Sequence, residues 1–160
     1  MLIVVDSALA DVDDLVREAA GYLARRLGGT PPLDAAALPP DAASALAAID
    51  TWAGDDVANW RQELIRWFEA HAPVRLVPDP QVNAALRRAA KGGTRMAVAS
   101  ALPPAALELV LQHLGCARAF AATVAGDGSL EDALDGARAA LGGDPPVVAT
   151  APELAAALAV

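Results

Sequence analysis

The segment that decides the fold is VPDPQVNAALRRAAKGGTRMAVAS, residues 77–100. It begins with a proline-containing turn, continues as a helical pattern over 81–91, stops at a glycine pair and ends in a short apolar run before Ser100. A helix, a glycine stop and a short continuous apolar run are typical of a parallel sheet, because helices cover both faces of such strands. The segment therefore predicts one unit of an α/β fold.

The same alternation continues to the end of the chain, and another apolar run opens it. The short apolar runs lie at 2–5, 96–99, 121–124 and 147–149, and the helical patterns of the C-terminal half lie at 81–91, 103–115, 130–142 and 152–159. Such alternation implies right-handed crossovers between parallel strands. We predict an α/β, Rossmann-like doubly wound parallel sheet of about four strands.

The segment 12–75 interrupts this alternation, because it contains helical patterns and no convincing strand. The first helical pattern starts at Asp11, and the later ones cover 42–52 and 55–70. We expect residues 1–11 and 76–160 to form the α/β core, and residues 12–75 to form a helical cap over its ligand-binding edge.

All three tryptophans, Trp52, Trp60 and Trp67, lie in the predicted cap. Tryptophan is enriched in the parts of interfaces that contribute most to binding, so these residues are candidates for an interaction surface. The alternative is that they form the core of the cap itself, as we expect for Trp60 and Trp67. A homodimer through the cap would satisfy both interpretations.

The chain is acidic, with a formal net charge of −8 and a pI near 4.6. Such a surface repels nucleic-acid phosphates and anionic lipids, so neither partner is expected. The single cysteine, Cys116, excludes an internal disulfide, and the N-terminal MLIVVD has no basic region typical of a signal peptide. We therefore expect a cytoplasmic location.

A first strand, a helical insertion and repeated helix–strand units resemble the haloacid dehalogenase (HAD) hydrolase superfamily with a small helical cap. The most specific match is 77–100, which is similar to the return of that family from cap to core. The similarity continues through Pro103 and 114–115 into 121–127, in step with the spacing of the family. The resemblance implies a phosphoric monoester hydrolase whose four motifs follow four strands.

In the first motif, the family places an aspartate nucleophile at the end of strand one and a second, proton-donating aspartate two residues later. One register keeps the three positions Asp6, Leu9 and Asp11 and puts Val4 at the nucleophile. The other register makes Asp6 the nucleophile and puts Ala8 at the proton donor. We favour the first register because it keeps more family positions, and either one lacks a carboxylate of the pair.

Of the remaining three motifs, only the second keeps the type of residue that the family has there. Ser100 matches the hydroxyl that binds a phosphoryl oxygen, although a serine after a strand also commonly caps a helix. Gly128 stands at the third motif, where a basic residue is needed, and no basic residue lies between Gly126 and Gly136. Thr150 stands where the fourth motif has a magnesium-binding aspartate, and a hydroxyl is a poor ligand for Mg²⁺.

The sequence thus predicts a HAD-like protein with a degenerate active site, a pseudoenzyme that binds a protein partner or a small ligand. Asp6 and Ser100 are its remnant catalytic residues, and Ser7, Asp11, Asp127 and Thr150 are candidates for a ligand cleft. No metal site and no cofactor are expected. The alternative is a HAD-type hydrolase of small phosphomonoesters that uses Asp6 as nucleophile together with Mg²⁺.

Overall fold

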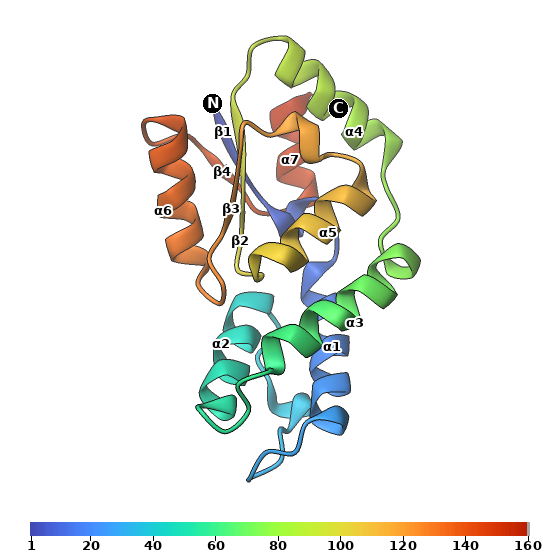
Figure 1. The fold of residues 1–160 in the computed structure, drawn as a ribbon. Helices are drawn as coiled ribbons and strands as arrows, with labels where there is room; N and C mark the ends of the chain where they lie inside the picture. The colour runs from blue at the N-terminus through green and yellow to red at the C-terminus, as the bar shows by residue number, and fades with distance from the viewer. Residues whose placement is uncertain (160) are drawn as a thin grey trace.

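A four-stranded parallel sheet forms the centre of the computed structural model, which describes residues 1–159. The strands lie in the order β3-β2-β1-β4 and comprise β1 (Leu2–Val5), β2 (Met96–Ser100), β3 (Ala122–Ala125) and β4 (Val147–Val148). Each pairs in parallel with its neighbours, and β1 lies between β2 and β4 (Figure 1). The predicted α/β fold class is confirmed.

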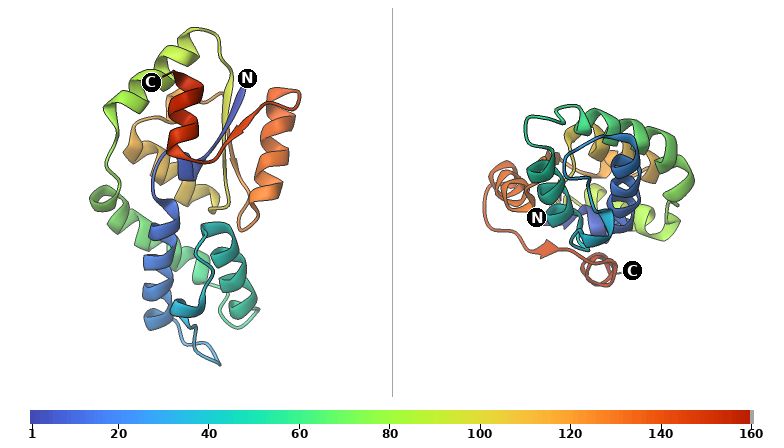
Figure 2. Two further views of the ribbon diagram at one scale, coloured as in Figure 1. Left: turned by 180° about the vertical axis from the view of Figure 1, so that it is seen from behind. Right: turned by 90° about the horizontal axis from the view of Figure 1, so that it is seen from below.

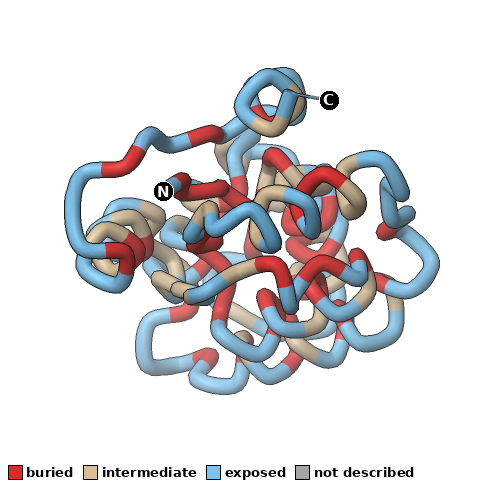
Figure 3. The backbone as a smooth tube through the Cα atoms, turned by 90° about the horizontal axis from the view of Figure 1, so that it is seen from above, coloured by how far each residue is buried: buried red, intermediate tan, exposed pale blue. Residues whose placement is uncertain are grey.

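The two faces of the sheet are buried against different helices, because side chains alternate along a strand. Ile3, Ala97 and Ala99 pack against α6 (Leu130–Leu141). Leu2, Val4, Met96 and Val98 belong to the larger core on the opposite face. That core also contains residues of α4 (Pro80–Lys91), α5 (Pro104–Leu114) and α7 (Ala151–Leu158). Figure 3 shows the buried residues gathered in this interior.

Helix α6 lies unusually close to β3, and Gly136 permits this approach. A Cβ atom at Gly136 would lie 2.7 Å from Cγ1 of Val124, which is too short for two carbon atoms. The absence of a side chain on this face of α6 therefore fixes the distance between helix and sheet.

Residues 12–75 form a separate group of helices, which we call the helical module. It consists of α1 (Val12–Arg26), α2 (Ala42–Ala53) and α3 (Trp60–Arg75), with a short 3₁₀ turn at Ala35–Ala37. Figures 1 and 2 place the module beyond the carboxyl ends of the strands, while both termini lie at the opposite end. Helices α1 and α2 pack together, and α3 packs against both α1 and α5 of the core.

The module differs in one respect from the sequence prediction. The helix expected over 55–70 begins at Trp60 and continues through Pro73 to Arg75. Pro73 lies in the last turn, where it removes only the hydrogen bond to the carbonyl of Glu69, a residue exposed to solvent. Among the described residues, no helix combines the length and the apolar character needed to cross a membrane.

The tryptophans stabilise the module from within. Trp60 and Trp67 are buried, with exposed fractions of 3% and 6%, so they are not available as an interaction surface. Trp52 is half-buried, and its indole N–H donates to the carbonyl of Pro31 at 2.8 Å. The expectation that Trp60 and Trp67 form the core of the module agrees with these positions.

Candidate functional site

The candidate site lies where β1 and β2 end side by side. Val5 is the last residue of β1 and pairs with Ala99, so Asp6 follows beside Ser100, the last residue of β2. Val4 lies inside β1 between Val98 and Val148, with no exposed surface. The side chain at the carboxyl end of the first strand is therefore that of Asp6, and not that of Val4.

Both carboxylate oxygens of Asp6 accept hydrogen bonds from the protein. Oδ2 accepts from the hydroxyl of Ser100, and Oδ1 accepts from the backbone N–H of Ser7 at 2.9 Å. The Ser100 hydroxyl oxygen in turn accepts from the N–H of Leu102 at 3.0 Å. Asp6 is 6% exposed and Ser100 is fully buried, so the hydrogen bonds of Ser100 are shielded from solvent, while that from Ser7 is only partly buried.

Burial changes the acidity of this carboxyl. Loss of hydration raises the pKa of Asp6 from its ordinary value of 3.8 to about 6, because burial removes more hydration energy from the charged carboxylate than from the neutral acid. The hydrogen bonds from Ser100 and Ser7 favour the charged form and partly oppose this rise, while the nearby charge of Asp13 adds to it. Asp6 therefore becomes protonated under mildly acidic conditions.

Ser7 joins the end of β1 to the end of β4. Its hydroxyl donates to the carbonyl of Ala149 at 2.8 Å. Thr150 begins α7, where its hydroxyl oxygen accepts from the N–H of Glu153 at 3.4 Å, and the Glu153 carboxylate accepts from the N–H groups of Ala149 and Thr150. Thr150 thus caps a helix, and its side chain does not hydrogen-bond Asp6.

Asp127 lies in the tight loop that follows β3. The loop is tied to the end of β2, since the N–H of Gly126 donates to the carbonyl of Ser100 at 2.8 Å and that of Gly128 to the carbonyl of Ala101 at 2.6 Å. Asp127 adopts a φ of 46°, in the left-handed region that non-glycine residues rarely adopt. This loop holds the Asp127 carboxylate toward the helical module.

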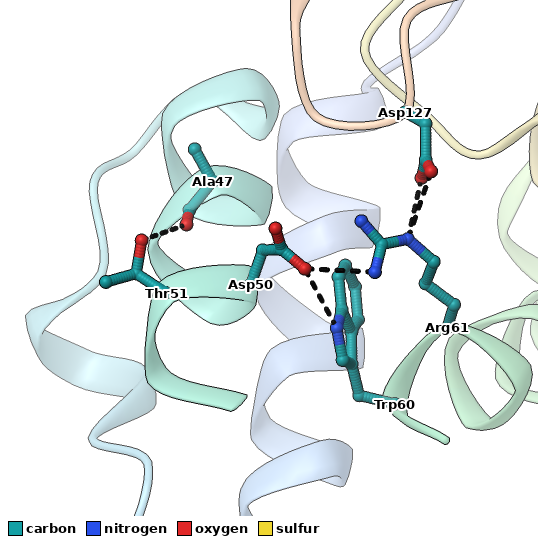
Figure 4. Close-up of polar contacts among 6 residues, drawn as sticks. All are labelled: Ala47, Asp50, Thr51, Trp60, Arg61 and Asp127. Carbon is teal, nitrogen blue, oxygen red and sulfur yellow. Dashed lines mark hydrogen bonds and ion pairs between the residues drawn. The ribbon is translucent and has the colours of Figure 1, made fainter. Parts of the chain in front are cut away.

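Arg61, at the start of α3, binds that carboxylate across the boundary between module and core (Figure 4). Its Nε lies 3.0 Å and 3.1 Å from the two oxygens of Asp127, and one terminal nitrogen lies 2.9 Å from Oδ1 of Asp50. The guanidinium also lies over the ring of Trp60, 4.4 Å from its centroid, and the Trp60 N–H donates to Asp50. We call Arg61, Asp50 and Asp127 the bridging triad.

The bridging triad was missed in the sequence. The segment from Gly126 to Gly136 indeed contains no basic residue, but the fold brings Arg61 to it from a helix 66 positions earlier. No local pattern distinguishes Arg61 from the other arginines of α3. Its role depends on the docking of α3 against the core.

Asp11 does not join Asp6. Its carboxylate accepts from the N–H of Asp14 at 3.1 Å and so caps α1, at the junction between core and module. A cavity of about 280 Å³ opens beside this junction, with Ser7, Asp11, Asp13 and Ala151 among its lining residues. Of the predicted cleft residues, only Ser7 and Asp11 share this cavity.

The residues at the strand ends do not fit a magnesium ion. Mg²⁺ requires several oxygen ligands and favours carboxylates, but Ala8 and Thr150 stand where further acids are needed. Both oxygens of Asp6 are already engaged by Ser7 and Ser100. Within residues 1–159, no group of three or more histidine, cysteine, aspartate or glutamate side chains is placed to hold a metal.

Solved structures similar to this chain identify its fold. No protein-family model matches the chain, and no curated protein matches it in sequence. CbbY from Rhodobacter sphaeroides is similar in structure: a variant in complex with xylulose 1,5-bisphosphate has a TM-score of 0.67 at 19% identity, over 92% of this chain and 75% of that one. The phosphate complex of CbbY gives 0.66 at 20% identity, over 92% and 76%.

A beta-phosphoglucomutase from Clostridium difficile is also similar, with a TM-score of 0.59 at 14% identity, over 89% of this chain and 70% of that one. These likenesses extend over core and helical module together, so they concern the whole topology and not only the sheet. At such low identity they establish the fold alone. The chain therefore has the fold of CbbY and of this beta-phosphoglucomutase, a parallel α/β core with a helical insertion after the first strand.

Proposed function

We propose that this HAD-fold protein does not turn over phosphomonoesters and acts by binding a partner or a small ligand, with the boundary between helical module and core as the binding region. The observation that carries the proposal is the state of Asp6. Its carboxyl is buried, and each of its two oxygens accepts a hydrogen bond from the protein. A nucleophilic carboxylate must reach phosphorus, and a carboxylate held in this way is not presented to a substrate.

The surroundings of Asp6 support the same conclusion. Ala8 cannot donate a proton to a leaving group, and Thr150 is engaged in capping α7. Arg61, the cation that the fold brings to the loop after β3, is paired with Asp127 and Asp50 and so is not free to neutralise a phosphoryl group. Losing the proton donor, the cation and the metal ligands together costs far more than losing one electrostatic contact.

The binding region follows from how the module meets the core. The bridging triad holds α3 against the loop after β3, and Ser7 and Asp11 line a cavity at the junction. In this respect the helical module acts as a cap. A ligand that separates Arg61 from Asp127 gains access to this boundary, which lies beside Ser100 and Asp6.

One observation favours the alternative, a hydrolase that uses Asp6. Asp6, and not Val4, stands at the end of β1 beside Ser100, which supports the register with Asp6 at the nucleophile position. CbbY, similar in fold, was crystallised with a bisphosphate and with phosphate. In this register Ala8 still stands at the proton donor.

The two functions are separated by assaying p-nitrophenyl phosphate hydrolysis with and without Mg²⁺, comparing wild type with Asp6→Asn. The proposal expects equal, background rates and no change in melting temperature with Mg²⁺, because a ligand of the native state must stabilise it. Turnover that Asp6→Asn abolishes would refute the proposal and establish the hydrolase.

A further inference from the structure

A second cavity lies on the other side of the core, at the C-terminal end of α5. It has a volume of about 470 Å³ and lies between α4, the end of α5 and the 3₁₀ turn Ala117–Ala119. Helix α5 starts just after Ser100, so its C-terminal end leads away from the edge that holds Asp6. Cavities of this size hold small organic ligands in other proteins.

The lining of this cavity is basic and contains no acid. Arg87 comes from α4 and Arg118 from the 3₁₀ turn, so two arginine residues from separate elements line one space. Asn83 lies one helical turn before Arg87 on the same side of α4, and Gln112 adds a second amide. Leu111 and alanine residues form the apolar part of the wall.

These two arginines differ from most others in the chain. Six of the arginines form ion pairs with aspartate or glutamate, namely Arg17, Arg26, Arg61, Arg66, Arg75 and Arg138. In the described part of the chain, neither Arg87 nor Arg118 has such a partner. For a chain with a net charge of −8, a cavity with two unpaired cations and no lining acid is a local reversal of charge.

The neighbouring polar groups do not oppose a negative ligand strongly. The carbonyl of Leu114 accepts from the Asn83 amide at 2.7 Å, and those of Leu111 and Gln112 accept from the N–H groups of Cys116 and Gly115. Burial raises the pKa of the Cys116 thiol to about 11, so it is neutral at ordinary pH. Glu108 accepts from Gln112 at 3.2 Å and so lies beside the cavity, but it is not one of the residues that line it.

We infer that this cavity is a binding site for a small organic phosphate, held by the guanidinium groups of Arg87 and Arg118. Planar guanidinium groups bind phosphate through paired, charge-assisted hydrogen bonds. The amide nitrogens of Asn83 and Gln112 donate to Leu114 and Glu108, which leaves their amide oxygens to accept from hydroxyl groups of a ligand. Leu111 and the alanines provide apolar contact. The site is separate from Asp6 and does not depend on the function proposed for that edge.

The test uses the full chain at low ionic strength with inorganic phosphate and ribose 5-phosphate as probes. We expect ribose 5-phosphate to bind more tightly and, at about a hundredfold excess over its Kd, to raise the melting temperature by roughly 5 °C or more. Arg87→Gln and Arg118→Gln should each weaken binding at least about tenfold in calorimetric titration. Asp6→Asn should leave binding unchanged.

Arg88→Gln is the matched control, because it removes the same charge from the same helix, next to Arg87, but lines a different cavity. Circular dichroism confirms that each variant is folded, and amide signals of Gly115 and Cys116 in the wild type report binding without any variant. Three results would overturn the inference: no binding of either probe, equal weakening by Arg88→Gln, or unchanged binding in both cavity variants. Loss of binding in Asp6→Asn would instead locate the phosphate at the carboxyl edge.

Discussion

Replacing Asp6 by asparagine should remove a specific pH dependence from the stability of this protein. The variant keeps the size and shape of the side chain but cannot ionise. In the wild type, the pKa of Asp6 is about 6 in the folded chain and near 3.8 in the unfolded chain. At pH values between these two pKa values, Asp6 is protonated in the folded state and ionised in the unfolded state.

This difference fixes both the sign and the size of the effect. Stability from Asp6 is fully present below about pH 3.8, and it is lost as the pH rises through about 6, because ionising the buried carboxyl disfavours the folded state. One pH unit of pKa displacement corresponds to about 1.4 kcal/mol, so the full change amounts to about 3 kcal/mol. The hydrogen bonds from Ser100 and Ser7 limit the change, since they favour the charged form.

The measurement is urea denaturation of wild type and Asp6→Asn at several pH values between about 4 and 7. The other carboxylates of this acidic chain titrate in both proteins, so the difference between the two curves isolates Asp6. We expect the wild type to lose about 2–3 kcal/mol more than the variant as the pH rises over this range. Parallel curves would show that burial does not raise the pKa of Asp6 and would refute this reasoning.

Three further predictions concern the contacts around this site. Ser100→Ala leaves Oδ2 of Asp6 and the N–H of Leu102 without their hydrogen-bond partner, so it should cost about 2–4 kcal/mol in denaturation. It should also raise the pKa of Asp6 further, as followed by carboxyl NMR. A double-mutant cycle with Arg61→Gln and Asp127→Asn should give a coupling of only about 0.5–1 kcal/mol, because the side chains are 36% and 44% exposed; a coupling near zero would show that the pair does not hold the module. Thr150→Ala removes the cap of α7 and should cost about 1 kcal/mol in thermal denaturation, without changing the chemical shifts near Asp6.

Much of the fold could be predicted from local pattern. The apolar runs at 2–5 and 96–99 became β1 and β2, and the glycine pair after α4 marks the end of that helix. Burial on both faces requires such continuous runs, so the sequence carries the signal directly. The sequence also predicted that the module is a group of helices. The predicted start of α3 at residue 55 was five residues too early, because the turns at 55–59 contain no proline that would mark them as turns.

The site was less accessible to prediction. Ser100 was identified because it directly follows an apolar run, which is a local property. The choice between Val4 and Asp6 was not local, because it depends on where β1 ends relative to β2. Matching on Asp11 favoured Val4, whereas the pairing of Val5 with Ala99 leaves Asp6 at the strand end.

The sequence by itself determined the α/β class and the helical module, since each follows from residue type and short-range spacing. It also showed that few acidic or basic residues follow the strands. Only the tertiary structure decided that Asp6 is buried against Ser100 and that Arg61 bridges to Asp127. These contacts join residues 94 and 66 positions apart. Pairing over such separations is set by the packing of the sheet and of α3 on the core, and no local periodicity encodes it.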